Sequence, residues 1–202
     1  MTLSLGPLLP VLILDDVESA RSLAEALRDG GISQAEVTLR TPAALDALRV
    51  MASVGDLTVG AGTVLTCEQA DASVEAGASF LVSPGWDPAL AAYAGELGVP
   101  LIPGVATPSE ALAARAAGCS QLKVFPISTL GGVAFIDALA AVFPDVTFVP
   151  SGGIRPEHAR EYLSCPSVET ICGSWMAPRA LVAAGDFAAV TAASRAAVEA
   201  IA

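Results

Sequence analysis

The chain has 202 residues, of which 53% are hydrophobic, and its formal net charge is −11. This length and composition suffice for a large core, and we expect residues 1–202 to form a single domain. The negative charge argues against a nucleic-acid-binding surface and against contact with anionic membranes. It also means that an anionic ligand must be attracted by local groups. No stretch approaches the roughly 18 uninterrupted apolar residues of a membrane-spanning helix.

Cysteine and histidine usage limits the kinds of site that the chain can form. The four cysteines, at positions 67, 119, 165 and 172, show no CxxC spacing, which is typical of free thiols in the cytoplasm. The single histidine, His158, rules out a zinc site with several imidazoles in one chain. No clustered acidic motif indicates magnesium. Residues 1–16 lack the features of a signal peptide. We therefore expect a cytoplasmic protein without metal or cofactor.

Apolar runs typical of strands alternate with helical patterns along the whole chain. In chain order the runs are residues 8–14, 35–39, 57–60, 80–82, 100–102, 121–125, 147–149 and 168–172. The first helix is predicted after Asp15 or Asp16 and ends at Gly30–Gly31, and the last extends from about Asp186 to Ile201. Eight strands, each followed by a helix, predict an α/β fold of the (β/α)8 TIM-barrel type. The alternative is a doubly wound open sheet, but the first strand lacks the Gly-rich loop expected there.

Three polar residues of the second predicted strand lie on one face of it. Glu36, Thr38 and Arg40 alternate with apolar Val37 and Leu39, so we expect them to point into the barrel. A buried carboxylate and guanidinium need partners, and an ion pair between Glu36 and Arg40 is one interpretation. Functional side chains of such barrels gather at the carboxyl ends of the strands. Thr63 and Pro84 follow the third and fourth strands and are expected at the same edge.

Lys123 is the only lysine of the chain, because the other nine basic residues are arginines. It lies in the apolar run Gln-Leu-Lys-Val-Phe-Pro (121–126), which predicts a buried strand. Burial disfavours an ammonium, so we expect a lowered pKa for Lys123 and a neutral amine that can form a Schiff base with a ketone. The alternative is a structural lysine that extends to the surface from the strand end. Phe125 would line the same site or pack in the core.

Gly-rich turns follow the last two predicted strands. Ser151-Gly152-Gly153 ends the seventh strand and Gly173-Ser174 ends the eighth. Barrels commonly bind phosphate at these two positions through backbone N–H groups. Glycine also serves turns for purely conformational reasons. Taken together the two turns predict a phosphate site, and a side chain at Gly153 is expected to crowd the anion.

The order and spacing of these motifs resemble the 2-dehydro-3-deoxy-phosphogluconate aldolase family, the class I aldolases of the Entner–Doudoroff pathway. The likeness covers roughly residues 8–200. The motifs that carry it are Glu-Val-Thr-Leu-Arg-Thr (36–41), Gly-Ala-Gly-Thr-Val-Leu (60–65), Ser-Pro-Gly (83–85), Pro-Gly-Val-Ala-Thr-Pro-Ser-Glu (103–110), Lys-Val-Phe-Pro (123–126), Gly-Gly (131–132), Pro-Ser-Gly-Gly-Ile (150–154) and Cys-Gly-Ser-Trp (172–175).

The resemblance implies a homotrimeric aldolase that cleaves 2-keto-3-deoxy-6-phosphogluconate (KDPG), a keto-acid phosphate, to pyruvate and glyceraldehyde 3-phosphate without a metal. It implies a Schiff base on Lys123 and a general acid/base role for Glu36. The substrate-binding residues it implies are Arg40 and Thr63 for the carboxylate, Pro84 and Phe125 for the pocket wall, and Gly152, Gly153 and Ser174, with Ser151 nearby, for the phosphate.

Other functions remain open from the sequence. The same chemistry on 4-hydroxy-2-oxoglutarate (KHG) is the nearest rival, and a non-catalytic sugar-phosphate-binding barrel or a phosphosugar isomerase would not need Lys123. The chain also departs from many relatives in lacking a helix before the first strand. We expect this to leave the bottom of the barrel less covered.

Overall fold

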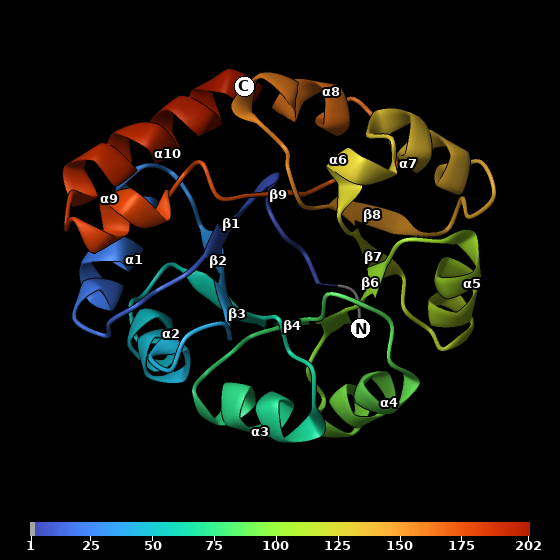
Figure 1. Cartoon of the computed structure of the whole chain (residues 1–202), viewed down its shortest axis with the longest axis horizontal. Helices are drawn as coiled ribbons and strands as arrows, with labels where there is room; N and C mark the ends of the chain where they lie inside the picture. The colour runs from blue at the N-terminus through green and yellow to red at the C-terminus, as the bar shows by residue number, and fades with distance from the viewer. Residues whose placement is uncertain (1–2) are drawn as a thin grey trace.

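The computed structural model describes residues 3–202, and in it parallel strands surround the centre of the molecule while the helices lie outside them (Figure 1). The strands are β1 (Leu8–Leu12), β2 (Gln34–Thr38), β3 (Thr58–Gly62), β4 (Leu81–Val82), β5 (Leu101–Ile102), β6 (Gly104–Val105), β7 (Gln121–Val124), β8 (Thr147–Pro150) and β9 (Ile171–Gly173). The helices are α1 (Ser19–Asp29), α2 (Ala44–Ala52), α3 (Cys67–Glu75), α4 (Pro88–Leu97), α5 (Pro108–Ala116), α6 (Ile127–Leu130), α7 (Val133–Ala140), the 3₁₀ helix η1 (Pro156–His158), α8 (Ala159–Leu163), α9 (Arg179–Ala183) and α10 (Phe187–Ile201).

The strands form two hydrogen-bonded sheets. The larger has the order β5-β4-β3-β2-β1-β9 and the smaller the order β6-β7-β8. The fifth predicted strand, residues 100–102, corresponds to β5, but a further short strand that was not predicted, β6, follows it after Pro103, which has no N–H for the ladder. The eighth begins at Ile171 rather than 168, and Val168 makes only an isolated bridge to Phe148. The α/β class with parallel strands is therefore confirmed, but the ladder does not run unbroken through eight strands.

Helix ends follow the capping signals in the sequence. Ser19 N donates to Asp16 Oδ1 at 2.8 Å before α1, and Ala189 N donates to Asp186 Oδ1 at 3.0 Å in the first turn of α10. Gly98 ends α4 in the left-handed conformation that favours glycine. Most strands are followed within a few residues by a helix, which gathers the strand-to-helix loops at one edge. Within residues 3–202, every helix is too short or too polar to be a transmembrane span.

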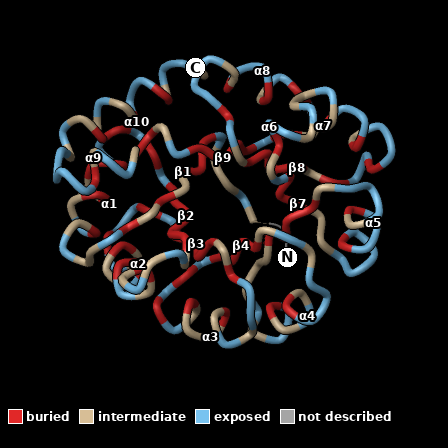
Figure 2. Tube along the Cα trace, in the orientation of Figure 1, coloured by how far each residue is buried: buried red, intermediate tan, exposed pale blue. Residues whose placement is uncertain are grey.

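Apolar side chains form two clusters, one on each side of the strands. The larger fills the space between strands and helices, and burial in Figure 2 is accordingly concentrated on the strands and on the inner faces of the helices. The smaller consists of inward-pointing side chains at the centre: Leu9, Phe80, Val82, Ile102, Val149 and Cys172. This inner cluster is a packed layer and forms a floor below the carboxyl ends of the strands.

The N-terminal segment covers the opposite end of the inner cluster. Leu3 and Leu5 pack against this cluster. The Gln121 side chain accepts a hydrogen bond from Leu3 N at 2.9 Å and donates one to Leu3 O at 2.8 Å, and Gln34 makes the same pair of bonds with Gly6 at 2.6 and 2.7 Å. An extended segment anchored by two buried glutamines therefore covers this end of the inner cluster.

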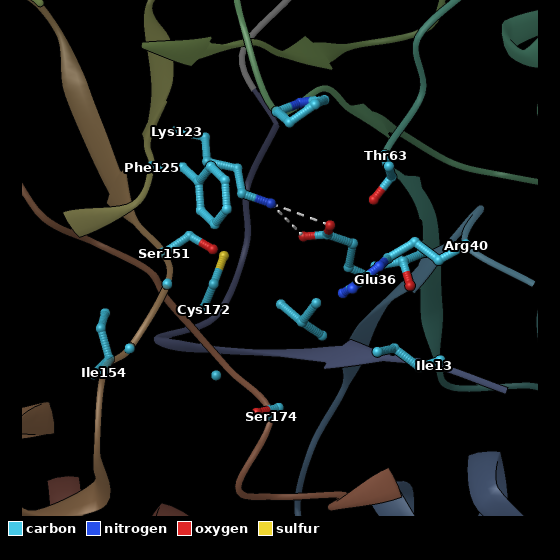
Figure 3. A pocket seen from close by; sticks show the side chains of 16 residues that line it. Ile13, Glu36, Arg40, Thr63, Lys123, Phe125, Ser151, Ile154, Cys172 and Ser174 are labelled. Atoms are coloured by element: carbon cyan, nitrogen blue, oxygen red, sulfur yellow. Dashed lines mark hydrogen bonds and ion pairs between the residues drawn. The ribbon is translucent and has the colours of Figure 1, made fainter. Parts of the chain in front are cut away.

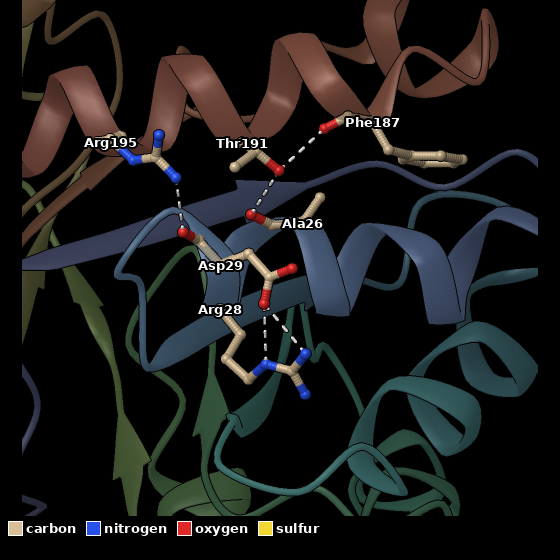
Figure 4. Close-up of polar contacts among 6 residues, drawn as sticks. All are labelled: Ala26, Arg28, Asp29, Phe187, Thr191 and Arg195. Atoms are coloured by element: carbon tan, nitrogen blue, oxygen red, sulfur yellow. Dashed lines mark hydrogen bonds and ion pairs between the residues drawn. The ribbon is translucent and has the colours of Figure 1, made fainter.

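The last helix packs against the first. Thr191 Oγ1 donates to Ala26 O and to Phe187 O, both at 3.1 Å, and Arg195 Nη2 donates to Asp29 O at 3.2 Å (Figure 4). The bonds to Ala26 O and Asp29 O connect α10 to the last turn of α1, where helix carbonyl groups often need partners from outside the helix. The contact places the first and last helices side by side around the strands.

Candidate active site

A cavity of ≈460 Å³ opens at the carboxyl ends of the strands. All ten residues proposed from the sequence line it, namely Glu36, Arg40, Thr63, Pro84, Lys123, Phe125, Ser151, Gly152, Gly153 and Ser174. Six further residues complete the lining: Val11, Ile13, Thr38, Ile154, Cys172 and Gly173. The tertiary structure thus brings together residues from strands that are widely separated in the chain. The prediction that Glu36, Thr38 and Arg40 share one inward face agrees with this, because all three line the cavity.

Lys123 and Glu36 meet in the interior of this cavity (Figure 3). The Nζ atom of Lys123 lies 3.2 Å from Oε1 and 3.3 Å from Oε2 of Glu36. Lys123 is only 6% exposed and Glu36 is fully buried. The lysine therefore does not extend to the surface, and Glu36 has Lys123 rather than Arg40 as its ion-pair partner. The Phe125 ring, whose centroid is 5.8 Å from Nζ, covers the amine on another side.

The ionisation of Lys123 differs from the expectation based on sequence. Burial is the largest single influence and by itself lowers the pKa of Lys123, but the charge and hydrogen bonds of Glu36 oppose it, and the pKa of Lys123 is raised above its ordinary value. The expected lowering is wrong because the sequence does not reveal that the carboxylate lies against the amine. The raised pKa of Lys123 favours its ammonium form in the resting site.

Gly62 provides the space that Glu36 occupies. It lies on β3, next to β2, and a Cβ atom at Gly62 would lie 2.0 Å from Oε1 and 2.6 Å from Cδ of Glu36. Atoms this close overlap, so any side chain at this position displaces the carboxylate. The position of the Glu36 carboxylate, the proposed proton shuttle, therefore explains why the third residue of the Gly-Ala-Gly-Thr motif, Gly62, has no side chain.

Gly62→Ala is expected to lower kcat by about 10²-fold or more, because general acid–base catalysis depends on the carboxylate lying within hydrogen-bond reach of the reacting group. The matched control is Gly85→Ala at the same end of the strands, where an added Cβ meets no atom within 4 Å. Steady-state kinetics of both variants check the expectation. Equal, small losses would contradict the assignment of Gly62 as the residue that makes room for Glu36.

Arg40 and Thr63 lie on the side of Glu36 away from Ser151 and Cys172 (Figure 3). Arg40 is exposed, and none of the ion pairs among residues 3–202 involves it. Thr63 has a φ of 60°, an uncommon conformation for a β-branched residue, and such strain often occurs where a side chain must be aimed at a ligand. An available guanidinium beside a hydroxyl suits a carboxylate group.

The turn after β8 contains two glycines with left-handed backbone conformations. Gly152 and Gly153 have φ values of 94° and 78°, a region in which side chains are strained. A Cβ atom at Gly153, however, would lie 2.2 Å from Ser128 Oγ. A side chain at Gly153 would therefore collide with Ser128 of α6 before any contact with a ligand is considered. Ser174 lines the same cavity and is exposed.

Cys172, whose side chain carries a thiol, lines the pocket but was not among the site residues proposed from the sequence. It lies on β9 immediately before Gly173-Ser174, is 1% exposed and belongs to the inner cluster. Burial raises the pKa of Cys172 to about 12. The thiol is therefore uncharged at neutral pH. Side chains alternate between the two faces of a strand, and the same alternation along β9 predicts that Cys172 points inward.

A buried lysine amine paired with a carboxylate at the carboxyl ends of parallel strands defines a Schiff-base (class I) aldolase type of site. Comparison with known families agrees, since the model for "Aldolase: KDPG and KHG aldolase" matches residues 1–193. The chain belongs to the KDPG and KHG aldolase family.

Individual relatives support the same assignment. The chain is 46% identical over 188 residues to the 2-dehydro-3-deoxy-phosphogluconate aldolase of Treponema pallidum, covering 93% of this chain and 90% of that protein. The KDPG aldolase of Legionella pneumophila, solved with pyruvate captured as a covalent carbinolamine intermediate, superposes with a TM-score of 0.92 at 40% identity, covering 95% of this chain and 93% of that one. The Zymomonas mobilis enzyme, solved with 3-phosphoglycerate, gives 0.90 at 41% identity, covering 96% and 91%.

Proposed function

We propose that this chain cleaves KDPG to pyruvate and glyceraldehyde 3-phosphate through a Schiff base on Lys123. The observation that carries the proposal is the contact between Lys123 Nζ and both carboxylate oxygens of Glu36 inside the cavity. The relatives named KDPG aldolase, and the covalent pyruvate adduct of the Legionella enzyme, support the same chemistry. Incubation with KDPG should release pyruvate, which a coupled lactate dehydrogenase assay measures.

Glu36 would move each proton of the reaction. It takes a proton from the Lys123 ammonium, the amine attacks the ketone at C2, and Glu36 protonates the resulting alkoxide to give the carbinolamine. It then transfers a proton from nitrogen to the hydroxyl, which leaves as water and yields the iminium ion. Glu36 next removes the C4 hydroxyl proton while the C3–C4 bond breaks into the iminium. After the aldehyde leaves, Glu36 protonates C3 of the enamine, and water hydrolyses the pyruvyl iminium.

The remaining pocket residues would bind the two ends of the substrate. Arg40 and Thr63 hold the carboxylate, while Pro84 and Phe125 wall the reacting centre. Backbone N–H groups of Gly152 and Gly153 and the hydroxyl of Ser174, with Ser151 nearby, bind the phosphate. The free guanidinium of Arg40 supports carboxylate binding at its end of the pocket, and the positive φ values of the two glycines support phosphate binding at the other end.

A second substrate, KHG, is also covered by the family description. It has a carboxylate in place of the long phosphorylated end, so it tests the phosphate site directly. Ser174→Asp is expected to raise KM for KDPG by about tenfold, because a carboxylate placed beside the phosphate repels it. KM for KHG should rise less, since its shorter anionic end lies farther from Ser174.

Ser33→Asp is the matched control, because Ser33 is exposed just before β2, at the other end of the strands, and the change adds the same charge. It should leave both KM values unchanged. If Ser174→Asp weakens both substrates equally, the phosphate does not bind at Ser174, and KHG becomes the better candidate for the physiological substrate.

The same proposal includes the arrangement of the fold. The two sheets are arcs of one closed (β/α)8 barrel, and residues 1–202 form one domain. A single residue, Pro103, separates β5 from β6, and the bridge between Phe148 and Val168 joins β8 to the segment before β9. The barrel assembles as a homotrimer in the cytoplasm, where its four free cysteines stay reduced. Light scattering during size-exclusion chromatography would test the trimer.

A further inference from the structure

We propose that Cys172 restricts the 2-oxo acid that adds to the aldehyde in the condensation direction to pyruvate, by closing the pocket beside C3 so that C3 can carry C4 of the product but no further carbon. This inference rests on the proposed function and assigns a specificity-determining role for the same site. The chemical class at issue is 2-oxo acids that already carry a carbon substituent on C3 before the aldehyde adds, of which 2-oxobutanoate, one methylene longer than pyruvate, is the smallest saturated example.

Geometry gives Cys172 this position. Its sulfur lies beside Ser151 and below the Lys123 amine, and both residues line the cavity with it (Figure 3). Arg40 and Thr63, the proposed carboxylate partners, lie on the other side of the amine. In a pyruvyl imine C2 is doubly bonded to Nζ, and its other two substituents, C1 and C3, lie on opposite sides of the C2–Nζ axis. If C1 lies toward Arg40, C3 lies toward Cys172.

The surroundings of Cys172 keep its side chain in place. It packs in the inner cluster with residues that include Leu9 and Val149 on the neighbouring strands of the ring, and both of these are at most 1% exposed. Packed interiors accommodate an added methylene poorly, because neighbouring side chains cannot move without straining others. A methyl group on C3 would therefore overlap with the Cys172 side chain, which has no space to move into.

The role of Cys172 is steric rather than nucleophilic. Burial raises the pKa of the Cys172 thiol to about 12, and only the thiolate is an effective nucleophile. The reaction also needs no second nucleophile, since Lys123 supplies the amine. What the thiol contributes is volume at a fixed place, so a smaller side chain should relax specificity without abolishing the reaction.

The test compares pyruvate with 2-oxobutanoate in the condensation direction, with glyceraldehyde 3-phosphate as the aldehyde. For Cys172→Ala we expect the ratio of kcat/KM for 2-oxobutanoate to that for pyruvate to rise by about tenfold or more, since one methylene in a tight pocket discriminates by about 10–200-fold. Cys172→Ser keeps the volume close to that of cysteine and should leave the ratio near its original value.

Cys165→Ala is the matched control, because Cys165 is also buried but does not line the cavity. It should not change the ratio. An unchanged ratio in Cys172→Ala, with pyruvate still trapped on Lys123 by borohydride, would overturn this inference alone. A ratio that rises as much in Cys172→Ser would also overturn it, since volume would not be the cause. Failure of the original protein to trap pyruvate would instead refute the proposed function.

Discussion

Treatment with pyruvate and borohydride is expected to inactivate the protein and to add one reduced pyruvyl group per chain. Borohydride reduces the imine between Lys123 and the ketone to a stable secondary amine. Because Lys123 is the only lysine, the only other primary amine of the chain is its α-amino group. Intact-mass measurement gives the stoichiometry, and peptide mapping should place the adduct on Lys123.

Lys123→Arg is the variant that tests this assignment, because a guanidinium keeps the positive charge beside Glu36 but cannot form the imine. We expect turnover to fall to the background of the assay and trapping to disappear. The activity of the unchanged protein should persist in EDTA, as a Schiff-base mechanism requires no metal. Residual trapping at another position, or substantial turnover by the arginine variant, would refute the proposed role of Lys123.

Glu36→Gln is expected to lower kcat by about 10²–10⁴-fold, the usual contribution of general acid–base catalysis. The amide keeps the size of the side chain but cannot accept and return protons at the amine, at the carbinolamine oxygen and at C3. It also removes the charge that raises the pKa of Lys123, so burial lowers that pKa and leaves a neutral amine. Pyruvate should therefore still be trapped on Lys123, although more slowly because Glu36 no longer assists imine formation, while turnover is lost.

Two controls separate this effect from damage to the fold. Glu199→Gln makes the same chemical change at an exposed position on α10 and should leave kcat unchanged. Urea denaturation should show whether Glu36→Gln remains folded, because removing one partner of a buried ion pair can cost about 3–5 kcal/mol. Near-normal turnover by a folded Glu36→Gln protein would mean that Glu36 is only the structural partner of Lys123.

Much of the architecture and of the site follows from local sequence patterns. Alternation along residues 36–40 determines that Glu36, Thr38 and Arg40 share one face of a strand, and all three line the cavity. The apolar run around Lys123 predicts burial, and its side chain is 6% exposed. Aspartates predict where α1 and α10 begin, and Gly30–Gly31 predicts where α1 ends. These patterns depend on neighbours a few residues apart, which the sequence displays directly.

Contacts between distant strands were decided only by the tertiary structure. Glu36 and Lys123 are 87 positions apart, and the carboxylate reaches the amine because β2 and β7 present their inward faces to one cavity. That contact reverses the expected pKa shift of Lys123 and replaces the ion pair considered between Glu36 and Arg40. The atom that a side chain at Gly153 would meet, Ser128 of α6, likewise comes from another part of the chain. Periodicity gives the face on which a side chain lies, whereas its partner depends on how strands from different parts of the chain are arranged around the same interior.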